Sequence, residues 1–213
     1  MADGSAFAAG DALALLDWKH RVSDLYAAAR AERDPRVAWR RWRDARDALF
    51  RDHPASPLPV EARARFGGCS YFEYEPSFRV VGDVIDTGPL AAELAASTGG
   101  SFRFARVGIV RFVLQGEARE LELTWNEGYG GGLLLAFRDG TSGEATYGGG
   151  RYLLDTVKGS ELGFDRDRRT LILDFNFAYN PSCSYDPRWA CPLAPPANTL
   201  PVDVTAGERL MRP

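Results

Sequence analysis

The chain has 213 residues, a hydrophobic share of 45% and a formal net charge of -3, which fits one globular domain with a substantial core. The negative charge argues against a nucleic-acid-binding protein, since such proteins need a basic face that displaces counterions. No stretch approaches the ~20 apolar residues that a membrane span needs, so we expect no membrane association.

The first ten residues lack a basic region followed by an apolar core, which argues against a signal peptide and favours the cytoplasm. In that reducing compartment, Cys69, Cys183 and Cys191 are more readily interpreted as thiols than as a disulfide framework. A disulfide between Cys183 and Cys191 stays open as an alternative. Seven residues separate these two cysteines, whereas zinc sites usually have roughly two to four, so we predict neither a metal nor a cofactor.

Residues 1–55 are predicted to form a pair of helices. Asp11 can cap a first helix from Ala12 to about Glu32, with apolar residues at helical spacing. Asp34 and Pro35 are typical of the cap and first position of a second helix. One side of that helix carries Trp39, Trp42, Arg46 and Leu49. The proline-rich residues 53–59 must end it, because proline cannot continue a helix.

From Gly67 onward the hydrophobic pattern has a period of two, which is typical of strands. Short links between successive strands require antiparallel pairing. We therefore predict a mainly β fold, an antiparallel β-barrel or sandwich of about seven or eight strands behind the helical pair. Its β core would span residues 65–180 of a single domain. The expected strands are Ser70–Glu75, Arg79–Thr87, Phe102–Leu114, Arg119–Asn126, Leu133–Arg138, Thr146–Thr156 and Thr170–Tyr179.

Residues 181–213 contain too many prolines for regular structure. They also contain Tyr185, Trp189 and Leu193, whose burial would anchor the segment. We therefore predict an ordered C-terminal strap that lies over the sheet. Asn176 and Asn180 are expected to hydrogen-bond the backbone of its first part, up to Asn198, since buried backbone groups need partners.

The segment from Asp174 to Asn180 is the first candidate site. If the strand stays regular, Asp174, Asn176 and Asn180 share one face, and Tyr179 lies on the other. A carboxylate and amides in a row can bind a polar ligand inside a barrel. They can equally hold the following loop in place by bonding its backbone.

The segment from Thr146 to Tyr152 is the second candidate, with Tyr147, Gly149 and Arg151 as ligand-binding residues. Glycines within a strand indicate a bulge or the close approach of another backbone or a ligand. Arg151 could bind a carboxylate or phosphate through two hydrogen bonds. Alternatively it could form an internal ion pair with Asp155 or Asp174. We expect residues 147–151 and 174–180 to lie on neighbouring strands.

Catalytic motifs for phosphate loops, zinc hydrolases and serine hydrolases are absent from the sequence. It has two histidines, His20 and His53, and His53 and Asp174 are the candidate catalytic residues. We rank a module that binds a small polar or anionic ligand first. A hydrolase with Asp174 as general base and Arg151 holding an anionic group is the alternative. A structural or interaction protein without a ligand site is the third interpretation. The oligomeric state is left open.

Two motifs together resemble a known family. The first runs from Asp139 to Gly143 and then from Thr146 to Leu153. The second runs from Asp174 to Pro181, with Cys183, Cys191-Pro192-Leu193 and a terminal Ala206-Gly207-Glu208. Their order and spacing resemble the bacterial and archaeal family called domain of unknown function 1684, from about Arg65 onward. The chain resembles a short form that lacks a His-Gly-Trp segment. The resemblance implies a shared site without naming its chemistry.

Overall fold

The computed structural model describes residues 8–211. The expectation about a signal peptide therefore falls mostly on residues 1–7, outside the described part. Of the described helices, none is long and apolar enough to cross a bilayer.

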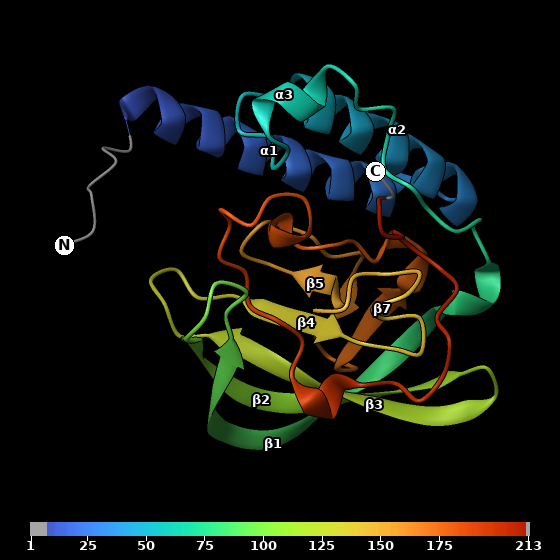
Figure 1. The fold of residues 1–213 in the computed structure, drawn as a ribbon. Coiled ribbons are helices and arrows are strands. Elements are labelled where there is room, and N and C mark those ends of the chain that lie inside the picture. The colour runs from blue at the N-terminus through green and yellow to red at the C-terminus, as the bar shows by residue number, and fades with distance from the viewer. Residues whose placement is uncertain (1–7, 212–213) are drawn as a thin grey trace.

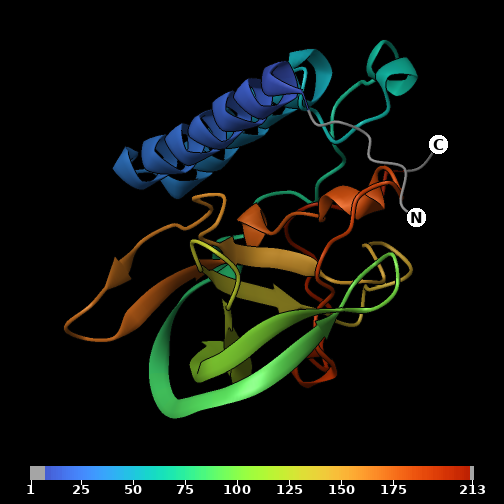
Figure 2. The same ribbon diagram turned by 90° about the vertical axis from the view of Figure 1, so that its left-hand side faces the viewer.

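Helices α1 (Ala9–Ala31) and α2 (Pro35–Asp52) pack side by side as a layer over the β part (Figures 1 and 2). The predicted cap of α2 is confirmed, because the Asp34 carboxylate accepts the Arg36 N–H at 2.9 Å. The start of α1 is three residues earlier than predicted, and the Asp11 carboxylate accepts the Ala8 N–H from within the first turn. A single turn, α3 (Val60–Arg63), follows the proline-rich loop.

Seven strands in the described residues form one antiparallel sheet, as predicted for a mainly β fold. The order across the sheet is β5-β4-β3-β2-β1-β7-β6, so most neighbours in the sheet are also neighbours in the sequence. The strands are β1 (Arg79–Ala95), β2 (Ser101–Leu114), β3 (Glu117–Asn126), β4 (Leu133–Phe137), β5 (Arg151–Asp155), β6 (Phe164–Asp165) and β7 (Thr170–Asp174).

The sheet does not close into a barrel, since β5 and β6 are its two edges. Strands β4, β5 and β7 lie nearer the helices than β1, β2 and β3, so the sheet folds over its core as in a sandwich (Figure 1). One bridge, Tyr152 with Tyr179, links β5 to the chain beyond β7. The ladder cannot continue there, because residues Phe175–Phe177 form a 3-10 turn directly after β7.

Three apolar clusters of buried residues lie in the described part of the chain, and the smallest packs Phe50, Leu58 and Phe66 together. Of the two larger clusters, one is enclosed by the sheet and includes Phe112 and Phe175. The other lies between the helical layer and the sheet, where the Trp42 and Phe177 ring centroids are 5.1 Å apart. The apolar side predicted for α2 therefore faces the sheet. That side also brings the charged Arg46 into the interior, with 8% of its surface exposed.

Three of the strand predictions are wrong: one strand does not form, one begins later than expected, and one ends earlier. Residues 70–75 make only an isolated bridge, between Tyr71 and Glu208. The strand expected from Thr146 begins at Arg151, because Gly150 has a φ of +94°, a left-handed conformation that ends the extended chain. The strand expected to reach Tyr179 ends at Asp174. The alternating faces predicted for Asp174, Asn176 and Asn180 therefore do not form.

The C-terminal segment crosses the sheet and returns toward the helices (Figure 1). Asn198 holds it near β3 and β4: its Nδ2 donates to the carbonyls of Glu122 and Ala136 at 3.0 and 2.9 Å. Trp189, which is half-buried, donates from Nε1 to the Pro57 carbonyl at 3.0 Å. These contacts join the segment to both layers of the fold.

Candidate functional site

Arg151 is fully buried, and its guanidinium donates hydrogen bonds to other groups of the protein. Its Nη2 lies 2.8 Å from Asp139 Oδ2 and 3.0 Å from the Val204 carbonyl. Its Nη1 donates to the Ala206 carbonyl and, at 3.4 Å, to the Glu208 carbonyl. The predicted ion pair with Asp155 or Asp174 is wrong, because the partner is Asp139. Arg151 thus binds three residues of the C-terminal segment and one carboxylate of the loop after β4.

Asp174 lies at the end of β7, with a fully buried side chain. One oxygen accepts from Arg79 Nη1 at 3.0 Å and from the Tyr74 hydroxyl at 3.3 Å. The other accepts the backbone N–H and the side-chain amide of Asn176 at 3.1 and 2.8 Å. Burial raises the pKa of Asp174, and the bonds from Asn176 and Arg79 oppose that shift. All of these partners are groups of the chain itself.

Asn176 and Asn180 bond backbone, but not the backbone that the sequence analysis expected. Asn176 accepts the Glu75 N–H and donates to the Glu75 carbonyl, both at 2.9 Å. Asn180 Nδ2 donates to the Arg209 carbonyl at 3.0 Å, beyond the first part of the strap. The turn that starts at Phe175 directs these amides toward the chain before β1 and toward the chain end.

The glycine-rich segment lies against the C-terminal strap. A side chain at Gly149 would meet the Tyr147 ring at 2.4 Å and Leu193 at 2.9 Å. The Tyr147 hydroxyl lies 3.5 Å from Cys183 Sγ. The glycines therefore allow a close approach of the strap, which is one of the two reasons considered for them. The expectation that residues 147–151 and 174–180 lie on neighbouring strands is wrong, because β5 and β7 are not neighbours in the sheet. One isolated bridge, between Tyr152 and Tyr179, connects the two stretches of chain just after Arg151.

His53 caps the C-terminus of α2 and has both ring nitrogens in hydrogen bonds. Nδ1 accepts the Ala55 N–H at 3.0 Å, and Nε2 lies 2.9 Å from Asp17 Oδ2. The first contact leaves the proton on Nε2, where it is donated to the carboxylate. The second candidate catalytic residue thus joins α1 to the end of α2.

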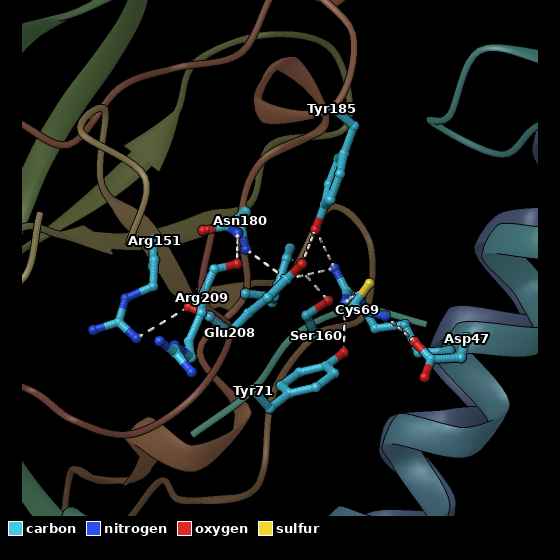
Figure 3. Close-up of polar contacts among 11 residues, drawn as sticks. Asp47, Cys69, Tyr71, Arg151, Ser160, Asn180, Tyr185, Glu208 and Arg209 are labelled. Atoms are coloured by element: carbon cyan, nitrogen blue, oxygen red, sulfur yellow. Dashed lines mark hydrogen bonds and ion pairs between the residues drawn. The ribbon is translucent and has the colours of Figure 1, made fainter. Parts of the chain in front are cut away.

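A buried polar cluster that the sequence analysis did not identify joins α2 to the chain end (Figure 3). Arg46 Nη2 lies 2.9 Å from Glu208 Oε2, and its Nη1 donates to the Tyr71 hydroxyl at 2.6 Å. The Tyr185 hydroxyl donates to Glu208 Oε1, and the Asn180 N–H donates to Glu208 Oε2 at 2.9 Å. The available signal was Arg46 itself, a charged residue among the apolar positions of α2.

The charges of this cluster balance. Burial alone lowers the pKa of Arg46, but the Glu208 carboxylate opposes burial and the pKa lies above its ordinary value, so the guanidinium stays charged. Burial raises the pKa values of Tyr71 and Tyr185, which keeps both phenols neutral. One cation thus faces one carboxylate, and neutral hydroxyl groups surround the pair.

A cavity of about 60 Å³ lies beside this cluster, between the helical layer and the β part. We call it the interlayer cavity. Its apolar wall comes mainly from the helices and includes Trp18, Val22 and Leu25. Its polar wall includes Arg46, Tyr185, Ser160, Lys158, Tyr179 and Asn180. Two of the predicted ligand-binding residues, Tyr179 and Asn180, therefore line it, whereas Arg151 and Asp174 do not.

The polar wall offers hydrogen bonds without a net positive charge. Lys158 Nζ is paired with Asp155 at 3.0 Å, just as Arg46 is paired with Glu208. Ser160 Oγ is buried and accepts a hydrogen bond from the Tyr179 hydroxyl at 3.3 Å. That bond leaves the serine proton available for an acceptor.

Comparison with known proteins agrees with the motifs. Residues 64–209 match the family model described as a protein of unknown function, DUF1684. The chain belongs to this DUF1684 family. The match includes Glu208 and Tyr185 but begins after α2, so Arg46 and the helical wall of the interlayer cavity lie outside it.

An uncharacterised protein of Haloarcula marismortui, solved by solution NMR, has a similar fold. It is 37% identical to this DUF1684 chain, with a TM-score of 0.59, and the match covers 78% of this chain and 89% of that one. No curated protein matches the chain. The relatives therefore support the family and the fold, and the chemistry must be argued from the site.

Proposed function

We propose that this protein binds a small, uncharged ligand in the interlayer cavity. The observation that carries the proposal is the composition of its walls: an apolar side from the helices faces a side with a buried hydroxyl and paired charges. Pockets that bind small molecules typically combine an apolar lining with a few placed polar groups. The proposal keeps the binding module of the sequence analysis but moves its centre from Arg151 to Ser160 and Asn180.

The size and charge of the cavity define the ligand class. A volume of about 60 Å³ has room for about four water-sized groups. An anion would need a free cation, whereas Arg46 and Lys158 are each held by a carboxylate at 2.9 and 3.0 Å. A neutral amide or alcohol instead needs only an acceptor and a donor, and Ser160 can supply the donor. Because Asp174 and His53 are held by internal bonds, we do not propose hydrolysis.

An isosteric pair of probes tests both the site and the charge preference. Acetamide and acetate have the same shape, and they would be titrated into ¹⁵N-labelled protein at fixed ionic strength. Each non-hydrogen atom contributes at most about 1.5 kcal/mol, so a ligand with four such atoms should have a Kd of tens of micromolar or weaker. The indole N–H signals of Trp18 and Trp42 report on the cavity, and that of Trp125, which does not line it, is the internal control.

We expect acetamide to shift the Trp18 and Trp42 signals in a saturable manner and acetate to shift them at least about fivefold more weakly. Val22→Phe, which fills the cavity, should abolish the shifts, and Ser160→Ala should weaken binding. Val60→Ala, at an exposed position, is the matched control. Equal binding of both probes contradicts the charge argument. Saturable binding that Val22→Phe leaves unchanged rules out the cavity, and no binding by either probe rules out the function.

A further inference from the structure

Two cysteines of the C-terminal strap lie against each other. The backbone N–H of Cys183 donates to Cys191 Sγ at 3.3 Å, although seven residues separate the two in the chain. Both are free thiols. The turn at Ser182–Ser184 carries Cys183, and the strap returns to place Cys191 beside it. The third cysteine, Cys69, belongs to the Arg46 cluster at 3.3 Å from its guanidinium.

The two thiols differ in exposure. Cys183 is partly exposed, whereas Cys191 is buried. Ser97, just beyond β1, fixes Cys191 on both sides: its Oγ accepts the Cys191 N–H, and its N–H donates to the Cys191 carbonyl, both at 3.0 Å. An accessible thiol next to a fixed, buried one is the arrangement in which the first thiol reacts and the second resolves the product.

The surroundings of Cys183 also favour its thiolate. The neighbouring Cys191 thiol, together with Ser97 and the Tyr147 hydroxyl, lowers the pKa of Cys183 to about 6, against the effect of burial. The same pairing and burial raise the pKa of Cys191. Burial raises the pKa of Cys69 as well. At neutral pH, Cys183 is therefore the cysteine that carries the nucleophilic form.

We propose that Cys183 and Cys191 form a reversible dithiol–disulfide site that exchanges with low-molecular-weight disulfides. The Cys183 thiolate attacks one sulfur of the disulfide, which forms a mixed disulfide and releases one thiolate. Cys191 then loses its proton and attacks the Cys183 sulfur, which forms the Cys183–Cys191 bond and releases the second thiolate. The dithiol is oxidised by two electrons, and the small disulfide is reduced to two thiols once it takes up two protons.

Peptide mapping can detect this bond directly. Trypsin cuts after Arg188, between the two cysteines, so their disulfide would join the peptides 170–188 and 189–209. The native, reduced protein would be treated with oxidised glutathione, quenched in acid, digested and analysed by mass spectrometry. We expect the joined peptides, an intact mass about 2 Da lower, and unmodified Cys69. Added dithiothreitol should restore the dithiol.

Two variants separate the steps. Cys191→Ser should stop the reaction at a stable glutathione adduct on Cys183. Cys183→Ser should leave Cys191 at least about tenfold less reactive than Cys183 in the wild type. The alkylation rate of Cys183 by iodoacetamide should rise with a midpoint near pH 6, well below the ordinary thiol range.

Three results would overturn the proposal. One is a lasting glutathione adduct on Cys183 in the wild type. Another is modification of Cys183 no faster than that of Cys69. The third is an alkylation midpoint near that of an ordinary thiol. The wild-type measurements decide the question even if a variant fails to fold.

Discussion

Arg151 and Asp139 form an ion pair that is closed to solvent: the atoms Nη2 and Oδ2 are 2.8 Å apart, and the side chains are 1% and 0% exposed. The other Asp139 oxygen accepts the Thr141 and Val204 N–H groups at 2.8 and 3.3 Å. The pair therefore connects β5, the loop after β4 and the C-terminal segment. Removal of one partner would leave an unpaired charge in the interior.

Arg151→Met should consequently lower the free energy of unfolding by about 3–5 kcal/mol, because the Asp139 carboxylate and three carbonyls lose their donor. Arg41→Met is the matched control. Its partner Glu32 lies at a similar 2.7 Å, but Arg41 is 75% exposed, so the expected loss is below about 1 kcal/mol. Urea unfolding at pH 7 measures both. A loss below about 1 kcal/mol for Arg151→Met would show that the pair contributes no net stability.

The raised pKa of Asp174 leads us to expect that the stability of the protein depends on pH. Burial raises the folded-state pKa of this carboxyl above the unfolded value, which is about 3.9. The folded protein then binds more protons than the unfolded chain between these two pKa values, so this group's contribution to stability is present below about pH 4 and is lost as pH rises through the folded pKa.

Asp174→Asn should remove that loss while keeping an acceptor for the Asn176 amide. We expect the difference in unfolding free energy between the variant and the wild type to shift in favour of the variant from pH 4 to pH 7. Asp44→Asn, at an exposed position, should show no such trend. A difference that moves the other way would mean that Arg79 and Asn176 outweigh burial.

The helical pair and the antiparallel sheet could be predicted because their signals are local. Asp34 and Pro35 mark the start of α2, and Trp39 and Trp42 at helical spacing mark its buried side. The alternation of Leu121 and Leu123 with charged residues likewise marks β3. Each of these signals depends on neighbours within one turn or one strand, which a sequence displays directly.

The partners of the buried polar residues could not be predicted, since those partners meet only in the folded chain. The sequence analysis proposed Arg151, Asp174 and Asn176 as site residues, but each of these side chains bonds a segment other than the one expected. Arg46 and Glu208 come from opposite ends of the chain, and no spacing rule connects them. The left-handed Gly150 and the turn at Phe175 also redirect the chain where alternation alone predicts a continuing strand.

A position can require glycine because its backbone is left-handed or because a Cβ would have no space. A comparison of Gly150 with Gly143 separates these two reasons. The φ values of the two glycines are nearly equal, +94° and +92°. A Cβ at Gly150 would lie 2.6 Å from Ala194 Cβ and 2.7 Å from the Phe137 carbonyl oxygen, whereas nothing lies within 4 Å at Gly143. Gly143→Ala should therefore cost about 1 kcal/mol of backbone strain.

Gly150→Ala should cost at least about 3 kcal/mol, because the overlap with backbone and with the strap adds to the same strain. Thermal unfolding of both variants measures the difference. Equal losses would mean that the strap shifts to make room for the Cβ. The close approach of the strap would then not be a reason for glycine at position 150.

Substitutions of Trp189 test how strongly this residue holds the strap against the rest of the protein. Its half-buried ring packs under the Arg188 guanidinium at 4.8 Å, and its Nε1 donates to the Pro57 carbonyl at 3.0 Å, which joins the strap to the loop after α2. Trp189→Ala should lower the unfolding free energy by about 2 kcal/mol, from partial loss of apolar burial and one hydrogen bond. Trp189→Phe, which keeps the ring without the donor, should lose about half of that.

Limited trypsin digestion gives the local measurement, because Arg188 is a cleavage site next to Trp189. The wild type should resist cleavage there, and Trp189→Ala should be cut at Arg188 well before it unfolds globally, since a strap that has lost its anchor opens locally. Trp125→Ala, which removes a tryptophan that is 41% exposed on β3, should leave Arg188 protected. Rapid cleavage at Arg188 in the native wild type would mean that the strap is not held by this contact, and that Cys183 and Cys191 are not kept together by the fold.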